Sequence, residues 1–261
     1  MTRATPRGVN FNPTARIAAM ALIATPLLIS VDIVSAGVAL LCELLGAPFL
    51  GMGWGRIIRR GWPVFMLAPL TGVSMLLYGR PEGKEYVSFA FAHITDNSVS
   101  LALAIMVRVL AIALPAVILS ADTDPTDLGD GLAQIWHLPE RFVIGSVAGV
   151  RLVSLFQRDY SAMHRARRAR GLADSGRIRR TLTIFFALLV LALRRGGKLA
   201  TAMEARGFGS DRPRTWARES RLRWPDWVLM VGALLVALMA LVTAWMTGYL
   251  RFLGGMMWSW R

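Results

Sequence analysis

The chain has 261 residues, of which 55% are hydrophobic, and it carries a net charge of +14. This apolar content is gathered in long runs, which argues against a soluble domain and indicates that the bilayer is the solvent. The single cysteine, Cys42, excludes a disulfide within the chain, and the three scattered histidines argue against a zinc site.

The first apolar stretch runs from Ile17 to about Gly53 and is too long for one membrane span. Pro26, Asp32 and Gly37 interrupt it, so it predicts two spans joined by a tight turn near Asp32. The basic residues before the stretch are typical of a signal peptide. However, the apolar run continues without a small-residue cleavage site, so we expect a retained first span.

Three further spans are expected downstream, at Trp62–Tyr78, Ser98–Ala121 and Trp227–Leu250. A basic cluster at Arg56–Arg60 precedes the first of them, and the Gly79–Asn97 loop that follows it is close to neutral. The positive-inside rule therefore places the N-terminus and the basic cluster in the cytoplasm and the loop outside.

These features divide the chain into three regions. Residues 1–121 form a four-span region, residues 122–223 a basic cytoplasmic or interfacial region, and residues 224–261 a C-terminal transmembrane helix. Seventeen basic and five acidic residues lie between Arg158 and Arg223, so this segment supplies +12 of the net charge. The middle region is therefore the part that sets this chain apart from a simple bundle of spans.

Two apolar runs in the middle region, Phe142–Phe156 and Thr181–Leu193, are shorter than the roughly 20 residues of a comfortable span. Each is followed by a basic, helix-like tail, which favours interfacial or re-entrant helices; a short spanning hairpin is the alternative. Ahead of them, Asp124-Pro125 predicts a helix start, with Asp as the N-cap, Pro in the first position and Asp127 in the first turn.

Two matching tripeptides each close a basic helix, with their arginines 36 residues apart: Ala169-Arg170-Gly171 and Ala205-Arg206-Gly207. Glycine after a helical run predicts a left-handed C-cap, and the arginine before it lies at the negative end of the helix dipole. The planar guanidinium suits a groove lined with carboxylates. Chance is the alternative, because the chain is rich in arginine.

With these motifs the chain resembles the T component of energy-coupling factor transporters, which includes the permease subunit of cobalt and nickel importers. The two Ala-Arg-Gly motifs are the most specific signature of that family. Asn12–Arg16 resembles its segment before the first span, and Thr123–Leu128, followed by Gly131-Leu132 and Leu138-Pro139, resembles its first coupling helix. The N-terminal third and the Trp-rich C-terminus depart from the family pattern.

The resemblance implies an all-α integral membrane protein with about five transmembrane helices and a cytoplasmic or interfacial coupling domain. This domain would contain two long crossed helices, about Phe142–Arg170 and Thr181–Arg206. Their motifs, centred on Arg170 and Arg206, would bind two ATP-binding-cassette ATPases, and the helices would pass beneath a membrane-embedded, substrate-binding S component. The complex would import a vitamin or a transition-metal ion across the bacterial cytoplasmic membrane.

The same resemblance implies that the chain has no catalytic residue and binds no cofactor or metal, because its partner ATPases use the ATP. The sequence contains no Gly-rich phosphate loop of the Walker type, in agreement with this expectation. Within the membrane, Arg108 and Glu43 are both expected mid-span, and an ion pair between them is the simplest interpretation.

Two other classes of function compete. A membrane-anchored basic module could bind anionic lipid or nucleic acid, although only Tyr160, Phe208 and Trp216 interleave with the basic residues, so no nucleic acid is expected. A self-contained secondary transporter would show paired polar residues in broken spans and an internal repeat, which this sequence does not.

Overall fold

The computed structural model describes residues 11–30, 32–78, 85–89, 92–120, 123–171, 176–210, 215–216 and 218–248. The chain divides into two compact units. Met1–Thr123 and Leu222–Arg261 together form the first unit, and Asp124–Arg221 forms the second. The C-terminal helix, which the sequence treats as a region of its own, packs against the N-terminal helices in the first unit.

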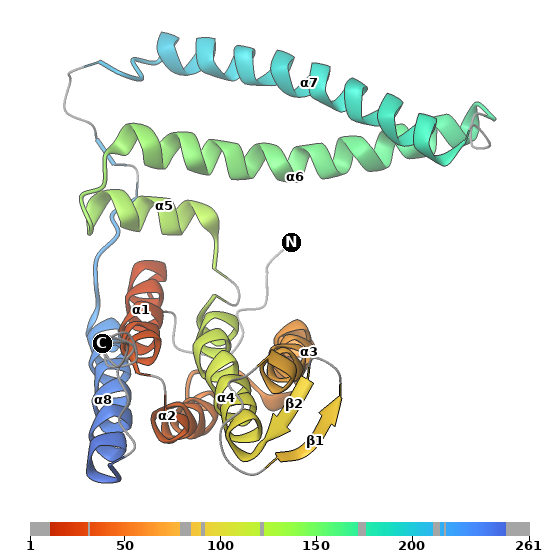
Figure 1. The fold of residues 1–261 in the computed structure, drawn as a ribbon. Helices are drawn as coiled ribbons and strands as arrows, with labels where there is room; N and C mark the ends of the chain where they lie inside the picture. The colour runs from red at the N-terminus through yellow and green to blue at the C-terminus, as the bar shows by residue number, and fades with distance from the viewer. Residues whose placement is uncertain are drawn as a thin grey trace, which may run out of the picture. The chain divides into compact units, whose positions relative to one another are not determined.

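The described residues of the first unit form five helices: α1 (Pro13–Ile29), α2 (Ile33–Gly46), α3 (Trp54–Tyr78), α4 (Asp96–Leu119) and α8 (Trp224–Met246) (Figure 1). The side chain of Asn12 caps α1 by accepting a hydrogen bond from the backbone N–H of Thr14, and Pro13 opens the helix. Asp32 caps α2 in the same way through the N–H of Ser35. The predicted turn near Asp32 is therefore confirmed.

Three of these helices, α3, α4 and α8, are long and apolar enough to cross a bilayer. α1 and α2 are equally apolar but have only 17 and 14 residues, so they fall short of the usual length of a span. The protein is thus a helical membrane protein with three clear candidate spans among its described residues. The expected total of five spans stays a prediction.

Helix α3 begins eight residues before its predicted start at Trp62. The basic cluster Arg56–Arg60 consequently lies in the first turns of the helix rather than in a connecting loop. Arginine is a good helix former, and the helix continues back to Trp54 through Pro63, which lacks the N–H that would bond the carbonyl of Arg59. The guanidinium of Arg56 donates a hydrogen bond of 2.7 Å to the backbone carbonyl of Gly51, just before the helix.

The segment predicted as an external loop contains a short antiparallel β-hairpin, which is a local departure from the expected all-α fold. β1 (Glu85–Phe89) pairs with β2 (Ala92–Thr95), with an irregularity between Glu85 and Val87. Both strands are rich in aromatic and β-branched residues, which favour extended backbone. Their runs are too short for their periodicity to stand out in the sequence.

A buried carboxylate ties the start of α8 to the start of α1. Asp226, in the first turn of α8 and only 1% exposed, accepts hydrogen bonds from the backbone N–H groups of Asn12 (2.6 Å) and Arg223 (2.7 Å). The two helices therefore begin at the same end of the unit. The predicted location of the N-terminus and the basic region on one side of the membrane stays a prediction.

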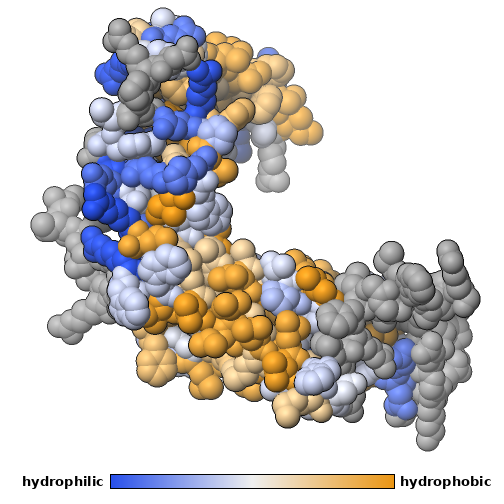
Figure 2. Space-filling model, turned by 90° about the vertical axis from the view of Figure 1, so that its left-hand side faces the viewer, coloured by the Kyte–Doolittle hydropathy of each residue, from blue (hydrophilic) through white to orange (hydrophobic). Residues whose placement is uncertain are grey.

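The core of the first unit is built from small side chains. Ala19, Ala39, Ala111 and Ala240 are each at most 1% exposed, and such residues allow neighbouring helices to approach closely in a bilayer. Many of the large apolar side chains point outward instead, and they form a nearly continuous apolar surface on the face seen in Figure 2. A surface of this kind is stable only against lipid or against another apolar protein.

The second unit contains α5 (Pro125–Gln134), α6 (Glu140–Ala169) and α7 (Arg177–Ala205). The predicted start of α5 is confirmed: Asp124 caps it, Pro125 opens it and Asp127 lies in its first turn. α6 and α7 form an antiparallel hairpin, with α5 packed against α6 (Figure 1). Neither long helix is apolar enough to qualify as a span, and the expected crossing of the two stays a prediction.

Candidate functional site: two arginine-bearing helix ends

Both Ala-Arg-Gly motifs lie at the C-termini of the long helices, with Arg170 as the C-cap of α6 and Arg206 as the C-cap of α7. Gly171 and Gly207 follow with φ angles of +69° and +82°. These are left-handed conformations that glycine adopts without the cost of a Cβ clash. The predicted left-handed glycines at the ends of the two helices are therefore confirmed.

Helix α7 ends in a complete Schellman motif. The N–H of Phe208 donates to the carbonyl of Met203, and the N–H of Gly207 donates to the carbonyl of Glu204, both at 2.9 Å. At the end of α6 the N–H of Gly171 makes the equivalent bond to the carbonyl of Arg168, at 3.1 Å. The residue that would complete this second motif, Leu172, lies outside the described residues. The two ends thus share one local geometry as well as one sequence.

Both motif arginines are exposed, as are Ala169 and Ala205 beside them. Neither guanidinium has a hydrogen-bond or ion-pair partner within the described part of the chain. Other arginines of the second unit differ: Arg218 bonds Asp127, and Arg195 bonds Asp159. Arg170 and Arg206 are therefore presented by the ends of rigid helices with their donors available to another molecule.

The two arginines lie at opposite ends of the hairpin. Arg141, at the start of α6, donates a hydrogen bond of 3.0 Å to the carbonyl of Gly209, just beyond α7. The end of α7 that carries Arg206 is therefore beside the start of α6, whereas Arg170 is at its far end (Figure 1). With a rise of 1.5 Å per residue, the 30 residues of α6 separate the two arginines by roughly 40 Å. They form two sites rather than one.

A salt bridge between Asp159 on α6 and Arg195 on α7 joins the two long helices. The contact is bidentate, since both terminal nitrogens of Arg195 donate to the carboxylate, and the two side chains are only 23% and 35% exposed. The sequence analysis did not identify this pair. The sequence shows only an acidic residue in one basic helix and an arginine in the other. This does not specify which residues of two antiparallel helices lie opposite each other.

Helix α5 buttresses the start of the hairpin. A Cβ on Gly129 would lie only 2.3 Å from Cγ2 of Val147, so the two helices pack at a distance that only glycine permits here. At the end of α5 the side-chain amide of Gln134 donates to the carbonyl of Arg218 (2.9 Å) and accepts from the N–H of Ser220 (2.8 Å). These two hydrogen bonds hold residues 218–220 against the end of α5.

The predicted ion pair between Arg108 and Glu43 is wrong. Arg108 donates to the backbone carbonyl of Leu28 at 2.6 Å, and neither carboxylate oxygen of Glu43 has a hydrogen-bond partner in the structure that we describe. Helix α4 places the guanidinium near the end of α1 and the start of α2, whereas Glu43 lies near the C-terminal end of α2. The described residues also hold no cluster of three or more side chains that could ligate a metal ion.

The described residues thus form a helical membrane unit and a basic helical hairpin that presents an exposed arginine at each end, which defines a helical membrane protein with a basic extramembrane part. Comparison with known proteins identifies the family. A family model described as CbiQ, cobalt transport protein, matches residues 7–216. The chain therefore belongs to this family and is a transmembrane T component of an energy-coupling factor transporter.

Its similarity to individual relatives extends over most of the chain. The energy-coupling factor transporter transmembrane protein EcfT of Limosilactobacillus fermentum is 28% identical over 221 residues, covering 78% of this chain and 81% of the relative. The protein of the same name from Brevibacillus brevis is 23% identical over 240 residues, covering 87% and 90%. That from Exiguobacterium sibiricum is 26% identical over 196 residues, covering 70% and 73%.

Proposed function

We propose that this chain transmits the conformational change of two ATP-binding-cassette ATPases to a membrane-embedded S component, so that the complex imports a vitamin or a transition-metal ion. In this proposal the chain is not an enzyme and binds no cofactor or metal of its own, because the ATPases bind and hydrolyse the ATP. The complex works in the bacterial cytoplasmic membrane, and the basic second unit faces the cytoplasm.

The observation that carries the proposal is the presentation of Arg170 and Arg206 at the two ends of one rigid hairpin. Two equivalent ends about 40 Å apart suit two copies, or two homologues, of one partner. A guanidinium fork on a helix end fits a groove lined with carboxylates or carbonyls, where it makes bidentate hydrogen bonds. Ala169 and Ala205 keep the approach to each arginine unobstructed.

The apolar face of α7 supports contact with an S component. Along this helix Ile178, Leu182, Phe185, Leu189 and Leu193 recur at the spacing of a single helical face, and each is between 42% and 78% exposed. The basic residues of α7 lie toward its two ends, at Arg177–Arg180 and Arg194–Lys198, and the middle of the helix, Thr181–Leu193, carries no charge. A face of this size at a membrane surface suits a sliding contact with an apolar partner, and this face extends between the two motif ends.

The proposal is tested by affinity capture of the full chain from its native membranes in mild detergent, with mass spectrometry of the partners. The Arg170→Glu, Arg206→Glu double variant is compared with Arg165→Glu, Arg194→Glu. The control pair carries the same change of charge on exposed positions of the same two helices. We expect cassette ATPases and a small membrane protein with the wild type and the control, and loss of the ATPases with the motif variant.

Binding of anionic lipid or nucleic acid by the basic face predicts a different result. Affinity would then depend on total charge and fall steeply with salt, so both double variants would behave alike. Equal loss of partners in the two variants, or ATPases retained by both, would contradict the docking role of the motif arginines.

A further inference from the structure

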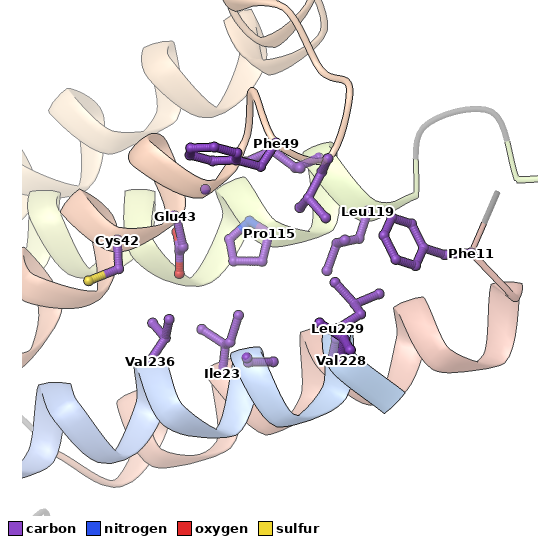
Figure 3. Close-up of a pocket in the computed structure, with 16 residues that line it drawn as sticks. Phe11, Ile23, Cys42, Glu43, Phe49, Pro115, Leu119, Val228, Leu229 and Val236 are labelled. Atoms are coloured by element: carbon purple, nitrogen blue, oxygen red, sulfur yellow. The ribbon is translucent and has the colours of Figure 1, made fainter. Parts of the chain in front are cut away.

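A cavity of about 360 Å³ lies within the first unit, between α1, α2, α4 and α8 (Figure 3). Of the sixteen residues that line it, Glu43 is the one with a charged side chain, and the others are apolar or glycine apart from Cys42. This volume and this mainly apolar lining, with one polar group, are typical of sites for small molecules.

The carboxylate of Glu43 points into this cavity from α2 (Figure 3). The residue is 92% buried, and neither of its oxygens has a hydrogen-bond partner within the described residues. Arg108, the basic residue expected to pair with it, is held by the carbonyl of Leu28 instead. A buried carboxylate without a partner is costly, and a native fold rarely tolerates one without a reason.

We propose that the cavity binds an amphiphilic cation, with Glu43 as the acceptor for its ammonium group. The apolar walls, which include Ile23, Leu229 and Val236, would hold the hydrocarbon part of the ligand. A primary ammonium supplies the hydrogen-bond donors that the carboxylate oxygens lack, and the attraction between opposite charges is strong in an apolar surrounding. This inference does not depend on the proposed coupling role.

The chain offers a way to fill the cavity without touching the carboxylate. Gly232 lines the cavity from α8, and a Cβ built on it meets no atom within 4 Å, so a leucine there occupies the empty space. Gly37 on α2 provides the matched control, because a Cβ there also meets no atom within 4 Å, but the residue does not line the cavity.

The test uses the full chain in nanodiscs of phosphatidylcholine, with dodecylamine as the probe and dodecanol as its neutral counterpart. Native mass spectrometry measures stoichiometry and affinity for the wild type and for Glu43→Gln, Gly232→Leu and Gly37→Leu. We expect one bound amine per chain and an affinity at least about tenfold lower in Glu43→Gln, since a charge-assisted hydrogen bond is lost.

Gly232→Leu should lower the affinity for dodecylamine by a similar factor, while Gly37→Leu should leave it unchanged. Dodecanol should show no difference between the wild type and Glu43→Gln. An amine affinity that is the same in the wild type and Glu43→Gln overturns the proposal, as does one that Gly232→Leu does not lower. If Glu43→Gln does not enter nanodiscs, the comparison of Gly232→Leu with Gly37→Leu decides, because both keep the carboxylate.

Discussion

Asp159 and Arg195 form a bidentate salt bridge between α6 and α7, and each lies eleven residues before the motif arginine of its own helix. Eleven residues are about three helical turns, so the contacting face of each helix is also the face on which Arg170 or Arg206 lies. The bridge therefore fixes the rotation of the two helices relative to each other, and with it the directions in which the two arginine ends are presented.

We expect removal of this bridge to loosen the hairpin. Asp159→Ala or Arg195→Ala should each lower the free energy of opening of α7 by about 1 kcal/mol, because the pair is only partly buried. Hydrogen exchange of the α7 amides measures this loss. The double alanine variant should lose little more opening free energy than either single variant. The exchanged pair Asp159→Arg, Arg195→Asp should recover part of this loss. Strictly additive losses would show that the bridge does not couple the helices.

A second prediction concerns the glycine that ends α7. Gly207→Ala places a side chain at φ +82° and should destabilise the Schellman motif by about 1 kcal/mol. Gly197→Ala, in the interior of the same helix with open space around its Cβ position, should stabilise α7 by about 0.5–1 kcal/mol. Amide exchange at Phe208 should accelerate in the first variant alone. Equal effects of the two substitutions would rule out a special role for the left-handed glycine.

The packing of α5 on α6 gives a third prediction. Gly129→Ala forces a methyl group against Val147 and should destabilise the second unit by about 1–3 kcal/mol. Gly145→Ala on α6, where a Cβ meets nothing within 4 Å, serves as the control and should have no such effect. Adding Val147→Ala to Gly129→Ala should restore much of the lost stability, measured by thermal unfolding of the purified chain. Failure of this rescue would mean that the contact is not the cause.

The elements that sequence reasoning predicted correctly depend on local chemistry. The start of α5 follows from Asp124 and Pro125, and the ends of the long helices follow from Gly171 and Gly207, because caps are defined by residues within one turn. The turn at Asp32 follows from the same principle. At each of these places, the residues that determine the structure lie within about one helical turn of it.

The features that were missed depend on contacts between distant segments. The salt bridge between Asp159 and Arg195 requires the register of two antiparallel helices, which no local pattern specifies. The predicted ion pair between Arg108 and Glu43 was wrong because a sequence that places two residues in apolar helices does not give their depth in the membrane. It also does not give the side of each helix on which they lie. The β-hairpin was missed because its two strands have only five and four residues.

The most direct test of the central claim, that both arginine ends of the hairpin contact the ATPases, is site-specific photocrosslinking in the assembled complex. Single cysteines replace Ala169 or Ala205 in a Cys42→Ala background, which keeps both motif arginines, and are labelled with a benzophenone maleimide. Ala162→Cys and Ala187→Cys, which are exposed on the same helices away from the ends, serve as controls. We expect ATPase crosslinks from both motif positions and none from the controls; crosslinks from the controls alone, or from neither motif position, would contradict the account.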